Sequence, residues 1–206
     1  MTDRVPDRQN GNTGDDGQPR VVLGVTGASG IPIALRTAEA LAARTELVTV
    51  VSEAARKTAR HEVADPDAAL ERFAELSTAT YDEDEIAAAV ASGSVAFRGM
   101  AIVPASMNTV AAIASGRADS LITRTAGVCL KERRTLVVVP RETPLSEIHL
   151  RNLTDLAGMG VDVVPPVLGF YYEPDGIDDV VDHVAGRVLD RFGFDHDLYE
   201  SWGDLD

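Results

Sequence analysis

Small and hydroxyl-bearing residues follow directly after the first apolar run of the chain, residues 21–25. They read TGASG (26–30) and come just before a helical pattern. Small residues let a ligand approach the backbone closely, and a helix N-terminus presents unpaired N–H groups with partial positive charge. We therefore expect Gly27, Ala28 and Ser29 to bind a phosphate-bearing ligand, although the leading Gly-x-Gly of a dinucleotide fingerprint is missing. A tight strand-to-helix turn without a ligand is the alternative.

Two further apolar runs end in hydroxyl-bearing residues. Ser52 follows the run at 46–51, and the run at 100–103 is followed by Pro104 and then by Ser106, Met107, Asn108 and Thr109. Hydroxyl and N–H groups gathered at one edge of a sheet form a cradle for phosphate. Taken alone, each serine is more often a helix N-cap, and that alternative stays open.

Cations concentrate in one stretch of this acidic chain: Arg124, Lys131, Arg133, Arg134 and Arg141. Arg141 follows the β-branched run at 135–139, at the same expected sheet edge as the serine loops. We expect a cation cluster at that edge to bind a second anionic group, for which the planar arginine fork is well suited. Glu142, amid these cations, is expected to stay ionised or to exchange protons with a ligand. A solvated charged face is the alternative.

Alternating strands and helices must position these groups. Strands are predicted at 21–25, 46–51, 100–103, 135–139 and 161–164, and helices over 31–43, 52–61, 107–115, 146–158 and 177–191. The polar, alanine-rich stretch 64–93 is predicted to form two short helices or a lid-like excursion. This alternation predicts a single α/β domain of the Rossmann type, a parallel sheet with helices on both faces. Residues 1–19 are predicted to be a flexible tail and 20–206 the folded domain.

Composition excludes several classes of function. The net charge of −14 argues against binding to nucleic acid or to an anionic membrane. With two lysines among its cations, the acidic chain is also typical of a high-salt cytoplasm. Cys129 is the only cysteine, which excludes an intrachain disulfide and a cysteine-built metal site, so we expect a small buried residue there. Without a signal peptide or a membrane-spanning run, a cytoplasmic protein is expected.

Four segments resemble the UbiX-type flavin prenyltransferases, a family formerly described as aromatic-acid decarboxylases of ubiquinone synthesis. They are TGASG (26–30), PASMNT (104–109), LITRTAGVCLKERRTLVVVPRETPLSEIHLRN (121–152) and GFYYEPDGIDDVVDHVAGRVLDRFG (169–193). The pattern LKERR…VPRETPL…IHL is highly specific, and the resemblance covers about residues 20–203. One departure is Ile31-Pro32-Ile33-Ala34, where the family often has Ala-x-Tyr-Gly.

The resemblance implies a flavodoxin-like Rossmann fold that assembles into a dodecamer with active sites between subunits. It implies FMN as the flavin, no metal, and transfer of a dimethylallyl group from dimethylallyl monophosphate to reduced FMN. The prenylated FMN would serve as the cofactor of UbiD-type decarboxylases, which are the implied downstream partners.

The resemblance also implies roles for individual residues. Glu142 would be the acid/base residue nearest the reacting centre, Ser29 would take part in proton transfer, and Glu62 matches a second family glutamate. FMN would be held by Gly27, Ala28, Ser29, Ser52, Ser106, Met107, Asn108, Thr109 and Arg141. The prenyl phosphate would be bound by Arg124, Lys131, Arg141, Tyr171, Arg187 and Trp202, drawn from more than one subunit.

Two other functions stay open. A flavin-dependent cysteine decarboxylase of the same fold would share the asparagine motif and would use a histidine in the region of His61. That chemistry does not need the arginine and lysine stretch, however. A non-enzymatic FMN carrier would likewise leave the cations of the second anion site without a role. Phe170 is expected to pack in the core, and His149 and His183 to be structural or exposed.

Overall fold

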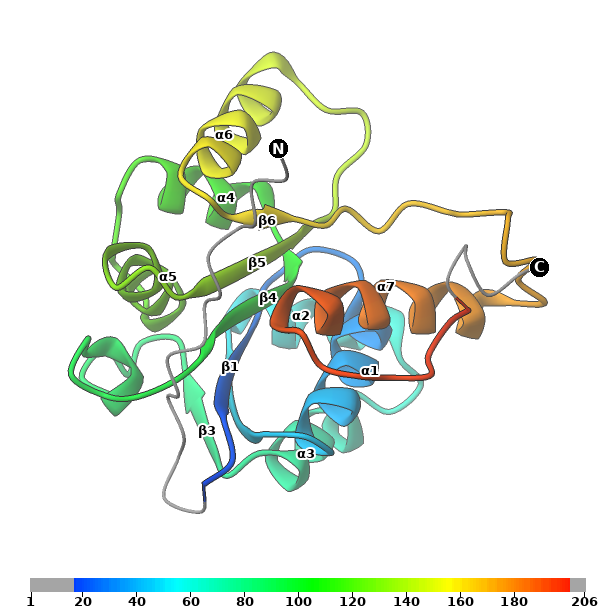
Figure 1. Ribbon diagram of the computed structural model, residues 1–206, viewed down its shortest axis with the longest axis horizontal. Coiled ribbons are helices and arrows are strands. Elements are labelled where there is room, and N and C mark those ends of the chain that lie inside the picture. The colour runs from blue at the N-terminus through cyan, green and yellow to red at the C-terminus, as the bar shows by residue number, and fades with distance from the viewer. Residues whose placement is uncertain (1–16, 201–206) are drawn as a thin grey trace, which may run out of the picture.

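Six parallel strands form one sheet in the computed structural model, which describes residues 17–200 (Figure 1). They are β1 (Arg20–Val25), β2 (Glu46–Val51), β3 (Ala79–Asp82), β4 (Gly99–Ala105), β5 (Thr135–Pro140) and β6 (Asp162–Val163), in the order β3-β2-β1-β4-β5-β6. The predicted α/β fold is confirmed. Most of the predicted tail, as well as Trp202, lies outside the described residues.

Helices cover both faces of this sheet (Figure 1). One face carries α1 (Ile31–Ala42), α2 (Glu53–Glu62), α3 (Pro66–Leu76) and α7 (Ile177–Phe192); the other carries α4 (Met107–Ala114), α5 (Leu121–Lys131) and α6 (Glu147–Gly158). Continuous apolar runs such as β1 arise because strands of a doubly covered sheet are buried on both sides. Val21, Leu23 and Val25 pack toward α1 and α7, and Val22 packs toward the opposite helices.

Three segments differ from the sequence-based prediction. The stretch 64–93 contains one helix, α3, then the edge strand β3 and a short 3₁₀ turn, Ala89–Ala91, so the two-helix prediction is wrong. Helix α5 was not predicted, because Thr123, Thr125 and Gly127 are weak helix formers. Strand β6 is shorter than predicted, since two of its residues pair with β5.

The sheet changes winding direction between β1 and β4. The helices that follow β1 and β2 lie on one face, and those that follow β4 lie on the other. Ligands of open parallel sheets bind in the crevice at such a switch point, beyond the carboxyl ends of the strands. The TGASG loop follows β1 and the Ser106–Thr109 segment follows β4, so both border that crevice. Among the described residues, no helix combines the length and apolarity needed to cross a bilayer.

Candidate active site at the carboxyl edge of the sheet

Thr26 joins the two loops that border the crevice. Its hydroxyl donates to the carbonyl of Pro104 at 2.7 Å and accepts from the backbone N–H of Ser106 at 2.8 Å. Thr26 is buried, so these bonds are shielded from water. The end of β2 is joined to the same place, because the N–H of Ser52 donates to the carbonyl of Val25 at 3.0 Å. The three strand ends therefore form one rigid edge.

Glu62 occupies the N-terminus of α1. It is the last residue of α2, and its Oε2 accepts from the backbone N–H groups of Gly30 at 2.9 Å and Ile31 at 2.8 Å. These are two of the donors that a helix leaves without partners at its start. We expected a ligand phosphate at this helix end, but a carboxylate of the chain itself takes the place.

Ser29 and Arg141 also interact with Glu62. Partial burial alone would raise the pKa of Glu62, but hydrogen bonds from Ser29, Gly30 and Ile31 and the charge of Arg141 hold it below its ordinary value. Glu62 is therefore an ionised acceptor for the hydroxyl of Ser29 at neutral pH. The structure thus brings together three residues predicted from different parts of the sequence, the Ser29–Glu62–Arg141 group.

Gly27 serves packing. A Cβ built on it would lie 2.4 Å from the Cβ of Ala54, in the first turn of α2. The hydroxyl of Thr58 also donates to the carbonyl of Gly27 at 3.3 Å. Close approach by a helix therefore explains this glycine, where the sequence analysis invoked a ligand. The contact also fixes the direction of α2, which carries Glu62 at its far end.

Ser52 and Ser106 are helix N-caps, as the alternative interpretation held. The Oγ of Ser52 accepts from the N–H of Ala55 at 3.0 Å, and the Oγ of Ser106 accepts from the N–H of Thr109 at 3.2 Å. Capping directs the starts of α2 and α4 toward the crevice. Asn108 is exposed at the start of α4, next to half-buried Ser106 and Thr109 and buried Met107. This set of hydroxyl, amide and N–H donors fits a polar ligand that carries a phosphate.

Arg141 and Glu142 lie on the loop after β5. The backbone N–H of Arg141 donates to the carbonyl of Ala105 at 3.3 Å, which joins this loop to the end of β4. Both side chains are exposed, and Oε1 of Glu142 accepts from the N–H of Thr143 at 2.9 Å. Glu142 therefore stands at the edge predicted for it, adjacent in sequence to the cation that interacts with Glu62.

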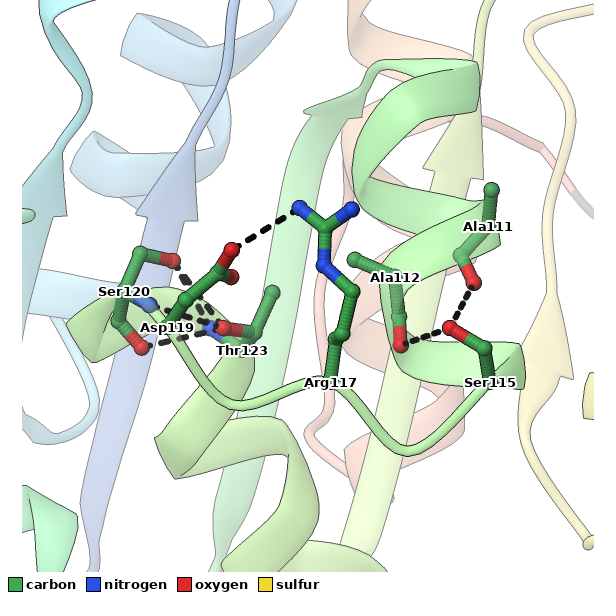
Figure 2. A network of polar contacts seen from close by, with 7 residues as sticks. All are labelled: Ala111, Ala112, Ser115, Arg117, Asp119, Ser120 and Thr123. Carbon is green, nitrogen blue, oxygen red and sulfur yellow. Dashed lines mark hydrogen bonds and ion pairs between the residues drawn. The ribbon is translucent and has the colours of Figure 1, made fainter.

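Arg124 lies in the first turn of α5, whose start is fixed by the network in Figure 2. Arg117 binds Asp119 at 2.8 Å, and the hydroxyl of Ser115 donates to two carbonyls at the end of α4. A capping box between Ser120 and Thr123 then begins α5. These contacts end one helix and start the next within a short connection.

Lys131, Arg133 and Arg134 lie at the opposite edge of the sheet, so the predicted cation cluster is wrong as a single group within one subunit. Lys131 is the last residue of α5, and Arg133 and Arg134 stand between α5 and β5, whereas Arg141 comes after β5. A six-residue strand separates the two ends by about 20 Å. The side chain of Lys131 is 61% exposed, with Glu132 at 3.9 Å.

Tyr171 and Arg187 lie on a third part of the molecule. Tyr171 belongs to the extended segment 164–176, which runs from β6 to α7 (Figure 1), and Arg187 is on α7. Phe170, expected in the core, is 78% exposed. Cys129 is buried as expected, and desolvation raises the pKa of its thiol to about 12. His183, which was expected to be structural or exposed, is buried.

Comparison with known proteins identifies the family. Residues 9–189 match the Flavoprotein family. The chain is 46% identical over 183 residues to the flavin prenyltransferase UbiX of Thermoplasma acidophilum, covering 89% of this chain and 99% of the relative. The chain belongs to the UbiX-type flavin prenyltransferase family.

Two solved structures of UbiX-type proteins have the same fold. AnUbiX in complex with FMN and dimethylallyl pyrophosphate superposes with a TM-score of 0.85 at 41% identity, covering 90% of this chain and 97% of that one. A dodecameric, FMN-dependent UbiX-like decarboxylase of Escherichia coli O157:H7 also gives 0.85 at 41% identity, with coverages of 89% and 98%. Family membership agrees with the resemblance found in the sequence.

Thr26 was missed by the sequence analysis. The sequence pattern that could have indicated Thr26 is a hydroxyl directly after a buried apolar run. That pattern does not reveal its partner, because the hydroxyl donates to the carbonyl of Pro104, 78 positions away. Asp190 and Tyr199, which bind Arg187, were also missed. No short-range pattern joins them to the predicted substrate residues.

Proposed function

We propose that this protein transfers a dimethylallyl group from dimethylallyl monophosphate to reduced FMN. The observation that carries the proposal is the Ser29–Glu62–Arg141 group at the β1/β4 crevice, in a chain of the flavin prenyltransferase family. In the reaction the allylic C–O bond breaks and phosphate leaves with the electron pair of that bond. The new bond to the prenyl carbon would use an electron pair of reduced FMN, and the proton displaced from the alkylated atom would pass to a carboxylate of the site or to the phosphate.

The capped helix starts at the carboxyl edge support FMN binding. Ser52, Ser106, Asn108 and Thr109 stand at the starts of α2 and α4, where N–H groups and the helix dipoles favour a phosphate. Gly27, Ala28, Ser29, Met107 and Arg141 complete the proposed flavin site. Ser29 is the member whose hydroxyl interacts with an ionised carboxylate, so it is the proposed link between flavin and Glu62.

Cations support departure of the phosphate. The leaving group gains negative charge in the transition state, and positioned donors stabilise that charge without a metal. Arg141 stands at the crevice, Arg124 at the start of α5 and Arg187 on α7, and Tyr171 adds a phenolic hydroxyl from the segment before α7. Lys131 faces away from these groups within its own subunit, so we assign it to the active site of a neighbouring subunit.

Two carboxylates support proton transfer. Glu62 is held ionised and can take a proton through the hydroxyl of Ser29. Glu142 is exposed beside Arg141 and is the proposed acid/base residue nearest the reacting carbon. We assign different roles to the two carboxylates because Glu62 is fixed by backbone donors at the start of α1, whereas Glu142 stands on a loop that is open to a substrate.

Exposed apolar side chains support assembly into an oligomer with shared active sites. Ile148, Val167, Leu168, Phe170 and Ile177 are each more than half exposed. An apolar surface of this kind marks an interaction site. The relative from Escherichia coli is dodecameric, and we propose a dodecamer here as well. UbiD-type decarboxylases in the cytoplasm are the proposed recipients of the product.

The direct test incubates the protein anaerobically with reduced FMN and either dimethylallyl monophosphate or the diphosphate, then measures the mass of the extracted flavin. A flavin heavier by one prenyl unit is expected with wild type, and far less of it with Glu142→Gln or Lys131→Ala. Glu53→Gln, an exposed residue of α2, is the control and keeps full product.

The result that contradicts the proposal is bound FMN of unchanged mass with both donors. Decarboxylation of a cysteine-containing substrate by the same preparation would then favour the cysteine decarboxylase. His61, its expected histidine, is exposed in the last turn of α2. FMN bound without either activity, and without specific binding of the donor, would identify a carrier.

A further inference from the structure

Gly186 stands in the middle of α7, where glycine destabilises a helix by about 1 kcal/mol relative to alanine. A Cβ built on Gly186 would lie 2.6 Å from Cδ1 of Tyr199 and 2.9 Å from Cε1 of His196. The residues after α7 therefore fold back along the helix and place two rings over this glycine. The glycine is explained by that close approach.

Asp190 joins those two rings to Arg187. Its Oδ1 accepts from Nε2 of His196 at 3.0 Å, and its Oδ2 accepts from the hydroxyl of Tyr199 at 2.6 Å. Oδ2 also accepts from Nη1 of Arg187 at 2.8 Å. The N–H of Leu198 donates to Nδ1 of His196 at 3.3 Å, which assigns the ring proton to Nε2 and fixes His196 as a donor to the carboxylate.

Tyr199 completes a closed set of bonds. Its hydroxyl accepts from Nη1 of Arg187 at 3.1 Å while donating to Asp190. Burial and the nearby carboxylate raise the pKa of Tyr199, so the hydroxyl stays protonated. Burial alone would raise the pKa of Asp190, but its bonds to Tyr199 and His196 and the charge of Arg187 lower it. The carboxylate is therefore ionised, and Arg187 is bound on one face by two acceptors.

The same cluster holds the segment that carries Tyr171. His183, which is 9% exposed, stacks on Tyr172 with ring centroids 4.6 Å apart and lies 4.6 Å from the ring of Tyr199. Tyr171 packs edge-on against Tyr172 at 5.3 Å. Two proposed donor-binding residues, Tyr171 and Arg187, are thus held by one connected set of side chains from α7 and from the segments before and after it.

Resting on the function proposed above, we infer that Asp190, His196 and Tyr199 are positioning residues that aim Arg187 at the phosphate of the prenyl donor. Within the described residues, the hydrogen bonds of Arg187 use Nη1, which leaves Nε and Nη2 for phosphate oxygens. Arg187 also borders a cavity of about 260 Å³ between α7 and the segment after β6. Fixing the guanidinium reduces the rotamer freedom that substrate binding must otherwise remove.

The test measures the KM for dimethylallyl monophosphate, kcat and the thermal midpoint. Tyr199→Phe keeps the ring over Gly186 and removes the hydroxyl, so KM should rise on the order of tenfold, while the thermal midpoint should fall by only a few degrees. Gly186→Ala removes no polar group but displaces the ring, and should raise KM similarly. Asp182→Asn is the matched control: Asp182 is also on α7, its substitution breaks an arginine–carboxylate pair with Arg36 of α1, and the variant should keep the wild-type KM.

A double-mutant cycle decides whether Tyr199 acts through Arg187. On an Arg187→Ala background, Tyr199→Phe should change KM by less than about twofold. An equal effect on both backgrounds, or an unchanged KM in the single variant, overturns the positioning role. Failure of the proposed function looks different, because wild type itself would then give no prenylated flavin.

Discussion

The cations at the two ends of strand β5 have different roles. At the carboxyl end, Arg141 is exposed and interacts with Glu62, whose carboxylate is bound by the start of α1. At the amino end, Arg134 donates to the carbonyls of Gly93 and Val95 at 2.8 and 2.9 Å, and its guanidinium lies 4.2 Å from the centre of the Phe97 ring. The first arrangement leaves a cation available to a ligand, and the second uses one to hold the fold.

Lys131 lies near the amino end of β5, but it does not hold the fold as Arg134 does. Its side chain is mostly exposed, and its ion pair with Glu132 at 3.9 Å is worth little in water. So weak a contact does not account for a lysine inside the segment that most specifically resembles the family. We therefore propose that Lys131 and Arg141 serve the same active site, although they lie at opposite edges of the sheet within one subunit.

The largest expected effect is loss of prenyl transfer in Lys131→Ala and Arg141→Ala. Each substitution would remove a proposed donor to the departing phosphate, and loss of such a donor typically costs about 100-fold in rate. The free energy of unfolding of Lys131→Ala should stay within about 0.5 kcal/mol of wild type. Single-turnover formation of prenylated flavin and urea unfolding at matched subunit concentration measure the two quantities. A wild-type rate in Lys131→Ala would show that Lys131 does not serve the active site.

Arg134→Ala should lower the free energy of unfolding and leave the rate of prenyl transfer unchanged. Loss of two hydrogen bonds and of the contact with Phe97 should lower the free energy of unfolding by about 2 kcal/mol. Under conditions below its unfolding transition, the variant should keep the wild-type rate of prenyl transfer per folded subunit. Arg133→Ala is the control at an exposed neighbour, with an expected change below about 0.5 kcal/mol. A normal stability together with a lost rate in Arg134→Ala would move Arg134 into the active site.

The smallest effect concerns the acid stability that Glu62 provides. The pKa of Glu62 is lowered on folding, so its contribution is complete above the unfolded pKa and is lost as the pH falls through the folded value. In Glu62→Gln, the free energy of unfolding should be about 1 kcal/mol lower at neutral pH, with a flatter decline below about pH 5.

Urea unfolding between about pH 3 and pH 7 gives these slopes. Glu53→Gln, at the exposed first turn of the same helix, should keep the slope of wild type. Identical slopes in Glu62→Gln and wild type would show that the carboxylate does not stabilise the start of α1.

The carboxyl edge could be predicted because its signals are local. An apolar run followed by small or capping residues identifies both a strand end and a helix start, as at Ser52 and Ser106. The contact of Glu62 with Gly30 could not be found this way, because it joins the end of one helix to the start of another across 32 positions. The family resemblance indicated Glu62 but not the donors that bind it.

The amino edge was misplaced because α5 was not recognised. Eleven helical residues return the chain across the sheet before β5 begins, so Arg124 and Lys131 lie at opposite ends of a helix about 16 Å long. Without that helix, cations close in sequence appear close in space. Phe170 illustrates a different limit: its apolar character indicates burial, but one subunit offers it no core.

Complementation between inactive variants tests most directly that both ends of β5 serve one active site. Lys131→Ala and Arg141→Ala subunits with different tags are co-expressed, and hetero-oligomers carrying both tags are assayed for prenylated flavin. If each site takes Lys131 and Arg141 from different subunits, about a quarter of the sites are intact and activity returns to that fraction of wild type. Hetero-oligomers as inactive as their parents would show that Lys131 and Arg141 do not act in one site from different subunits.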